Sequence, residues 1–196
     1  LETIFSSGPV AETSAKLAPK ITISDNTSEV FCIKFSPDGK YLAAGCGDGA
    51  IRVFSTQTGK LAYNLQAGSN VALPTTAIQF RPVTPTSRTK NVLLCSNAAG
   101  TVQHWHMTSG KCLHSLDDAD NQVYALDYND EGSQFVTAGK DKVVRVFDEA
   151  TKSLLLSMEG GLGYSSTRAT PGHSNRVFSA KFKPGDPNVV VSGGWD

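Results

Sequence analysis

The chain has 196 residues, of which 39% are hydrophobic and 18% charged, as is usual for a globular protein with one sizeable core. Its 18 basic and 18 acidic residues cancel, so the composition supplies no argument for a nucleic-acid partner. No apolar run approaches the roughly 18 residues that span a bilayer, and the N-terminus does not resemble a secretion signal. We therefore expect an intracellular protein without membrane association, in the cytoplasm first and the nucleus second.

The chain begins with two short segments of different character. Residues 1–19 are rich in Ser, Ala, Thr and Gly, and we predict a flexible tail or linker there. Residues 20–24 (KITIS) alternate polar and apolar side chains, which predicts a short strand. The main domain is predicted to cover residues 20–196.

An internal repeat is the most informative feature of the chain. The segment 29–37 (EVFCIKFSP) resembles 176–184 (RVFSAKFKP), and weaker copies occupy 75–82 and 122–129. Each copy precedes a turn and then further short apolar runs separated by Gly-, Asp- and Pro-containing turns. The repeat predicts units at about 27–67, 70–117, 119–159 and 172–196, the last one truncated.

The spacing of the units indicates their architecture. Phe54, Trp105 and Phe147 occupy the same place in the third strand, and the insert 81–90 lengthens the first interval. Four-stranded units repeated every 40–45 residues or so are typical of propeller blades. The predicted fold is all-β, with three complete blades of four antiparallel strands and half of a fourth.

The units resemble the repeats of the WD40 β-propeller family. That family places a Gly-His pair before strand one, Ser or Thr in strand two, Asp in the next turn and Trp in strand three. The resemblance implies a structural role for a set of matching residues: Asp48, Trp105, Thr137, Asp141, His173, Ser192 and Asp196. The repeats are degenerate, because no unit holds all four residue types. Trp195-Asp196 is not the signature dipeptide, because Asp196 aligns with the turn residue Asp48.

Three and a half blades do not close a ring, because the open ends would expose unpaired strands. We expect a longer parent chain to complete the ring, in preference to homo-oligomerisation. The resemblance implies that the strand at 20–24 completes the last blade of that ring.

The resemblance also implies a non-enzymatic scaffold that binds peptides or partner proteins on the propeller rim. One column of side chains follows the first Val of strand one, and a second column precedes the turn Asp. Together they form the candidate partner-binding rim: Phe31, Tyr124, Lys140, Phe178 and Trp195. Aromatic side chains are common binding anchors, although packing between blades is an alternative role for them.

Two other functions stay open. A propeller-based enzyme would carry its chemistry at the channel mouth, and His173, Ser192 and Asp196 contain the elements of a Ser-His-Asp set. No nucleophile elbow surrounds Ser192, so we assign no catalytic residue. A nucleic-acid-binding module would use the basic side chains of the two long inserts: Arg81, Arg88, Lys90 and Arg168.

We assign no metal or cofactor. The most metal-like group, on two predicted paired strands, consists of His104, His106, Cys112 and His114, but His104 and Cys112 align with core residues of other units. The four cysteines show no CxxC spacing. We expect four buried, reduced thiols, without a Cys32–Cys46 disulfide even though these two residues flank one hairpin.

Overall fold

A computed structural model describes residues 20–24, 26–66, 73–85, 87, 89–117, 120–160 and 172–196. The predicted tail at 1–19, Arg88 and Arg168 lie outside these residues. Within them the structure is all-β, with a single 3₁₀ turn at Met107–Ser109. No helix in the described part of the chain is long and apolar enough to cross a membrane.

The strands form three four-stranded antiparallel sheets and one two-stranded sheet, as predicted. The first sheet, blade 1, contains β1 (Val30–Phe35), β2 (Tyr41–Cys46), β3 (Ile51–Ser55) and β4 (Leu61–Leu65). Blade 2 contains β5 (Thr75–Phe80), β6 (Val92–Asn97), β7 (Thr101–His106) and β8 (Lys111–Asp117). Blade 3 contains β9 (Val123–Tyr128), β10 (Gln134–Gly139), β11 (Val144–Asp148) and β12 (Leu154–Met158). Blade 4 contains β13 (Val177–Lys183) and β14 (Asp186–Gly194).

The turn between the second and third strands needs a left-handed residue at one aligned place. Gly49 and Gly100 occupy it in blades 1 and 2 with φ of 78° and 86°, and Lys142 occupies it in blade 3 with φ of 73°. Glycine adopts this conformation without steric cost, whereas a lysine is strained there. The tight turn is therefore retained in blade 3 at a local energetic cost.

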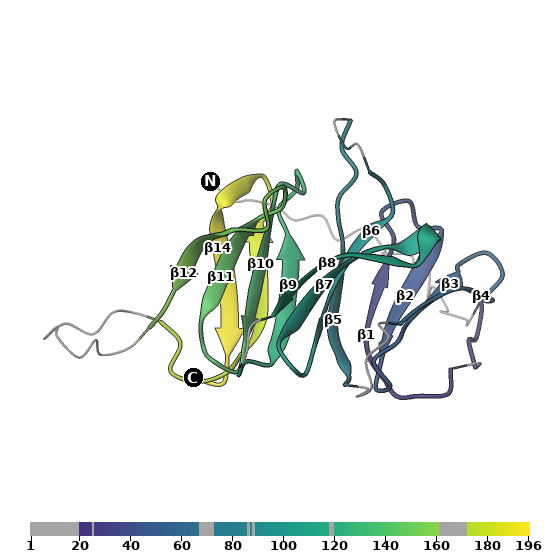
Figure 1. Cartoon of the computed structure of the whole chain (residues 1–196), viewed down its shortest axis with the longest axis horizontal. Coiled ribbons are helices and arrows are strands. Elements are labelled where there is room, and N and C mark those ends of the chain that lie inside the picture. The colour runs from purple at the N-terminus through teal and green to yellow at the C-terminus, as the bar shows by residue number, and fades with distance from the viewer. Residues whose placement is uncertain are drawn as a thin grey trace, which may run out of the picture.

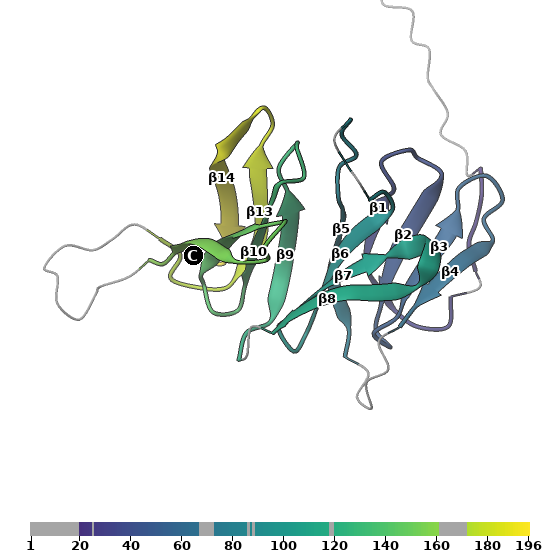
Figure 2. The ribbon, with the colours of Figure 1, turned by 45° about the horizontal axis from the view of Figure 1, so that its top comes forward.

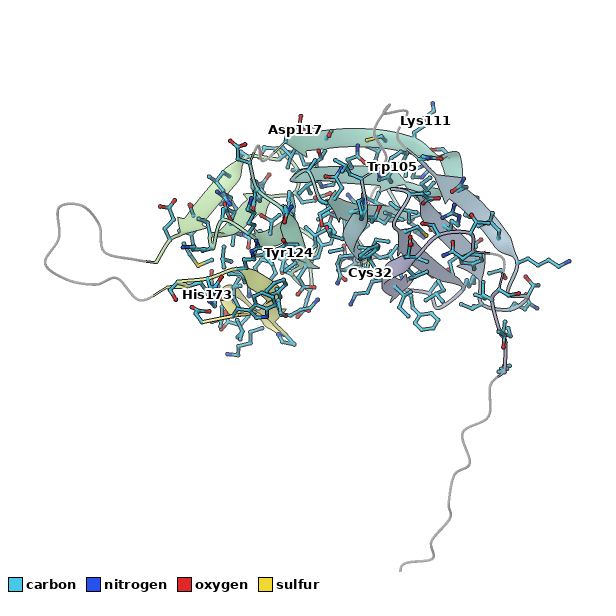
Figure 3. All side chains as sticks on the ribbon, turned by 90° about the horizontal axis from the view of Figure 1, so that it is seen from below. Cys32, Trp105, Lys111, Asp117, Tyr124 and His173 are labelled. Carbon is cyan, nitrogen blue, oxygen red and sulfur yellow. The ribbon has the colours of Figure 1, made fainter. Side chains whose placement is uncertain are left out.

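The blades stand side by side (Figures 1 and 2) and follow an arc when viewed from below (Figure 3), and the first strands of consecutive blades contact one another. Viewed from below, Lys111 and Asp117 lie on the outer edge, whereas Cys32 and Tyr124 lie towards the inner side (Figure 3). The hydrophobic core is divided into clusters that each fill the space between consecutive blades. The fold is thus held together by contacts between faces of neighbouring sheets.

One column of the repeat shows what this packing does. Phe80, Tyr128 and Phe182 each face the preceding blade and are only 6%, 4% and 6% exposed. Phe35 has the same place in blade 1 and is 64% exposed. The face of blade 1 on which Phe35 lies is therefore not covered by a neighbouring sheet, as the corresponding faces of the other blades are.

Residues 20–24 partly cover that open face. Ile23 packs against Ala44, Cys46 and Phe54, and Ile21 contacts Gly59. The segment is not a strand, so this prediction is wrong for the structure. An alternating sequence becomes a strand only when a neighbouring backbone pairs with it, and the segment contacts side chains of blade 1 instead.

The cysteines differ more in burial than expected. Cys46 and Cys95 are buried, but Cys32 is half-buried and Cys112 is exposed, so the prediction of four buried thiols is wrong for Cys112. Burial raises the pKa of Cys32 to about 11 and that of Cys95 to about 12. Cys32 packs towards blade 2 and Cys46 towards the opposite face, so a disulfide between them is sterically excluded.

The difference in burial between Phe80 and Phe35, which occupy the same place in their blades, leads to a stability prediction. Phe80→Ala should lower the free energy of unfolding by about 3–5 kcal/mol, because it opens a cavity between blades 1 and 2. The matched change Phe35→Ala should cost less than about 1 kcal/mol in this chain, because the ring is largely exposed already. Urea denaturation of both variants measures the difference, and equal losses would contradict the packing described here.

Candidate functional site

The aligned turn aspartates fasten the loops that border the rim. In blade 1, Asp48 accepts hydrogen bonds from the Ala50 amide and from Nη1 and Nη2 of Arg52, the last two at 3.2 and 2.6 Å. The Arg52 hydrogen bonds hold the pKa of Asp48 below its ordinary value. In blade 3, Asp141 accepts from Val143 and pairs with Arg145 at 2.5 Å in the same way.

These arginines were missed in the sequence, although the repeat contains a signal for them. Arg52 and Arg145 occupy one column, four residues after the turn Asp. Blade 2, which has Ala99 in place of the Asp, has Gln103 in place of the Arg. The two residue types change together because an unpaired, half-buried guanidinium would be costly.

His173, Ser192 and Asp196 come together in blade 4. His173 Nδ1 lies 2.8 Å from Asp196 Oδ1, and its Nε2 lies 2.7 Å from Ser192 Oγ. The Ser174 amide donates to Asp196 at 2.9 Å, and the hydrogen bond from His173 lowers the pKa of Asp196. This chain of bonds links the end of β14 to the segment before β13.

Trp105 and Thr137 are buried without the partners that the family pattern would supply. The Trp105 indole donates to Gln103 Oε1 at 3.3 Å and is buried in the cluster between blades 1 and 2. Thr137 lines a cavity of about 200 Å³ together with Arg145 and Phe147. Phe147 has no polar atom to offer a hydroxyl, so blade 3 relies on the Asp141–Arg145 pair.

A buried ionic cluster between blades 2 and 3 is a feature that the sequence did not reveal. Glu149, at the end of β11, lies 3.0 Å from His104 Nε2 and 3.2 Å from the Tyr128 hydroxyl. Its other oxygen pairs with Lys152 at 2.8 Å and with Arg81 at 3.3 Å. The cluster ties the insert after β5 to the β11–β12 turn.

Burial and hydrogen bonding set the charges of this cluster. Burial alone would raise the pKa of Glu149, but hydrogen bonds from His104 and Lys152 bring it below its ordinary value. Burial lowers the pKa values of His104 and Lys152. Neutral His104 therefore donates from Nε2 to the carboxylate, and its buried Nδ1 has no partner among the described residues.

The residues considered as metal ligands do not converge. His104 and His114 are paired across β7 and β8, but His104 is engaged with Glu149. His106 contacts Ser109 at 2.6 Å, and Cys112 is exposed opposite Trp105. Within the described ranges, no group of three His, Cys, Asp or Glu side chains is placed to hold a metal ion.

Three of the five candidate rim residues form one aromatic ladder. Tyr124 and Phe178 stack with ring centroids 4.9 Å apart, and Phe178 and Trp195 lie 4.9 Å apart at 48°. Phe178 is 38% exposed and Trp195 is 70% exposed. Lys140 is exposed in the turn after β10.

Phe31 lies apart from this ladder. The corresponding residue of blade 2 is Thr76, whose hydroxyl donates to the Val123 carbonyl of blade 3 and contacts Ser96. Phe31 is 58% exposed in blade 1 and is separated from Tyr124 by blade 2. The predicted rim thus divides into a ladder on blades 3 and 4 and a single ring on blade 1.

Two family models match the sequence. One, described as the Anaphase-promoting complex subunit 4 WD40 domain, matches residues 13–82, and the other, described as WD domain, G-beta repeat, matches residues 110–148. Eukaryotic translation initiation factor 3 subunit I of Bombyx mori is 32% identical over 104 residues, 53% of this chain and 28% of that protein. Pre-mRNA-splicing factor cwf17 of Schizosaccharomyces pombe is 25% identical over 159 residues, 80% of this chain and 44% of that protein.

Solved structures share the fold. A chain in the crystal structure of the Mitotic Checkpoint Complex aligns with a TM-score of 0.67 and 18% identity, over 87% of this chain and 46% of that chain. U3-55K aligns with a TM-score of 0.70 and 15% identity, over 88% of this chain and 47% of that chain. This chain therefore spans less than half the length of the relatives named here.

The stacked four-stranded sheets and these matches define the class of protein as a β-propeller with repeated blades. The chain belongs to the WD40-repeat β-propeller family. WD40 propellers in general are non-enzymatic scaffolds that bind other proteins.

The buried His104 leads to a prediction about pH. Because its folded pKa is lowered, the unfolded chain takes up the proton first. Its contribution to stability is complete above the unfolded pKa of about 6.5 and is lost as the pH falls from there towards the folded pKa. Urea denaturation should therefore show a lower free energy of unfolding at about pH 5.5 than at about pH 7.5.

His104→Gln is the control for this prediction. Its amide can donate to Glu149 but does not titrate, so the variant should lose less stability between the two pH values. Glu149 itself does not contribute within this window, because its pKa lies below it. An identical pH dependence in the wild type and in His104→Gln would show that His104 is not its source.

Proposed function

We propose that this chain is part of a non-enzymatic scaffold that binds peptides or partner proteins through its rim. The observation that carries the proposal is the exposed ladder of Tyr124, Phe178 and Trp195. Contiguous exposed apolar groups mark interaction sites. Aromatic anchors on a rigid support lose little freedom when they bind.

The relatives support an assembly role in general terms. Their names connect them with translation initiation and pre-mRNA splicing, processes carried out by large complexes inside the cell. By analogy, the proposed scaffold acts inside the cell. We propose that a longer chain, in preference to other copies, supplies the rest of the ring, because this chain spans less than half the length of the relatives named above.

An enzymatic role has one observation in its favour, the hydrogen-bonded order Ser192–His173–Asp196 beside a cavity of about 300 Å³. We propose a structural role for this set. Ser192 lies within β14, where the backbone on both sides of it is paired with β13. A serine nucleophile of this kind sits on a sharp turn between a strand and a helix, and Ser192 lies in a regular strand instead.

A nucleic-acid role is also less favoured by the structure. Arg81, the first basic residue of its insert, is mostly buried and paired with Glu149, so it is not available to a phosphate. Lys90 is exposed, but one lysine contributes little to a binding mode that depends on several phosphate contacts.

Substitution of Phe178 tests the scaffold proposal. Phe178→Ala should remove a central anchor and reduce the capture of specific partners from cell extract by tenfold or more, about 1.4 kcal/mol. Its free energy of unfolding should fall by less than about 1.5 kcal/mol, because the ring contacts the ladder at the surface. Quantitative pull-down and thermal melting of the same protein measure both effects.

Leu113→Ala is the matched control, because Leu113 is an exposed apolar residue on the outer strand β8. It should capture the same partners as the wild type. A sharply lowered melting temperature for Phe178→Ala would make Phe178 a core residue. Equal capture by all three proteins would remove the ladder from the binding surface.

A further inference from the structure

Unpaired positive charge accompanies the aromatic ladder. The Lys140 amide donates to the Gln122 carbonyl at 3.0 Å, and the Gln122 side chain accepts a hydrogen bond from the Tyr124 hydroxyl. The Trp195 amide donates to the Arg176 carbonyl at 3.1 Å. Lys140 and Arg176 therefore lie at the ends of strand pairs that also hold aromatic rings of the ladder.

The local charge is positive because Arg145 balances Asp141, so that Lys140 and Arg176 outnumber the carboxylate of Asp196. Asp141 pairs with Arg145, and Asp196 bonds to His173 and the Ser174 amide. Within the ranges that the structure describes, neither Lys140 nor Arg176 has an ion-pair partner. Since the chain as a whole is neutral, this local excess does not reflect a generally basic surface.

The coincidence of rings and cations is confined to blades 3 and 4. The column that contains Arg176 holds Glu29 in blade 1 and Pro74 in blade 2, and the column that contains Lys140 holds Gly47 and Ala98. The rim around Phe31 therefore carries the opposite charge next to its aromatic ring. One part of the rim is suited to acidic ligands and another is not.

We propose that the surface formed by Tyr124, Lys140, Arg176, Phe178 and Trp195 binds an acidic peptide segment that contains an aromatic or large aliphatic side chain. This proposal rests on the scaffold function proposed above. The apolar side chain packs on the exposed faces of Phe178 and Trp195, and carboxylates of the peptide lie near Lys140 and Arg176.

A single-stranded nucleic acid fits this surface less well. Bases need free ring faces on which to stack, and the facing sides of Tyr124 and Phe178 are occupied by each other at an interplanar angle of 23°. Two unpaired cations also provide too few phosphate contacts for strong backbone binding. The charge and the partly occupied rings together favour an acidic peptide.

The fluorescence of Trp195 can report peptide binding directly. The chain has two tryptophans, and Trp105 is only 3% exposed whereas Trp195 is 70% exposed. Titration of the protein with acetyl-Asp-Glu-Phe-Glu-Asp-amide should shift the tryptophan emission to shorter wavelength as Trp195 becomes covered. Its dissociation constant should be at least about tenfold lower than that of acetyl-Lys-Arg-Phe-Lys-Arg-amide. The dissociation constant of the acidic peptide should rise with salt concentration, because salt screens the charges.

Charge reversal tests the assignment of the cations. The double variant Lys140→Glu and Arg176→Glu should weaken binding of the acidic peptide by about tenfold or more and strengthen binding of the basic one. Lys111→Glu, on the outer edge of blade 2, is the matched control and should leave both constants unchanged (Figure 3). Thermal melting confirms that each variant is folded.

The remaining outcomes separate this proposal from the scaffold function. If Phe178→Ala weakens both peptides equally and charge reversal has no effect, the acidic partner is rejected and the rim function stands. If a ten-residue oligouridine binds the wild type more tightly than the acidic peptide, the ligand is a nucleic acid and the proposal is overturned. If Phe178→Ala changes neither the peptide affinities nor partner capture, both proposals fail.

Discussion

The contact between faces of consecutive sheets is the interaction on which the rest of this structure depends. Each cluster of the core is shared by two blades, so no single sheet buries its apolar face alone. Stacking also places the inner strands β1, β5, β9 and β13 next to one another. Tyr124 and Phe178 belong to different blades, and their rings stack only because this packing aligns β9 with β13.

Different blades hold the turn that follows the second strand with different side-chain interactions. Blades 1 and 3 pair the turn Asp with an Arg of the third strand, whereas blade 4 joins Asp196 to His173 and Ser192. Blade 2 lacks the acid, and Asn97 Oδ1 accepts hydrogen bonds from the Ala99 and Thr101 amides of the same turn instead. Several of these polar groups are half-buried or buried, and such groups are tolerated only with partners. Degeneracy of the repeat is therefore compensated locally, without loss of the blade architecture.

The position of the rim residues depends on these hydrogen bonds. Hydrogen bonds to Asp141 and Asp196 hold the turns that carry Lys140 and Trp195, and Arg145 balances the charge of Asp141. Side-chain hydrogen bonds therefore fix the turns that present the aromatic surface before any partner arrives. A preorganised surface of this kind loses less conformational entropy on binding than a flexible loop does.

The sequence by itself determined the number of blades within the chain, the four-stranded antiparallel order of the complete ones, and the columns that hold Asp48, Asp141 and Asp196. These properties follow from period-2 patterns, turn chemistry and repetition, all of which are local. Only the tertiary structure decided which side chains meet across blades. It joined Arg81 and His104 to Glu149, placed Cys32 and Cys46 on opposite faces, and separated Phe31 from the ladder. It also left 20–24 without a strand partner, because burial and pairing depend on neighbouring sheets that are distant in the chain.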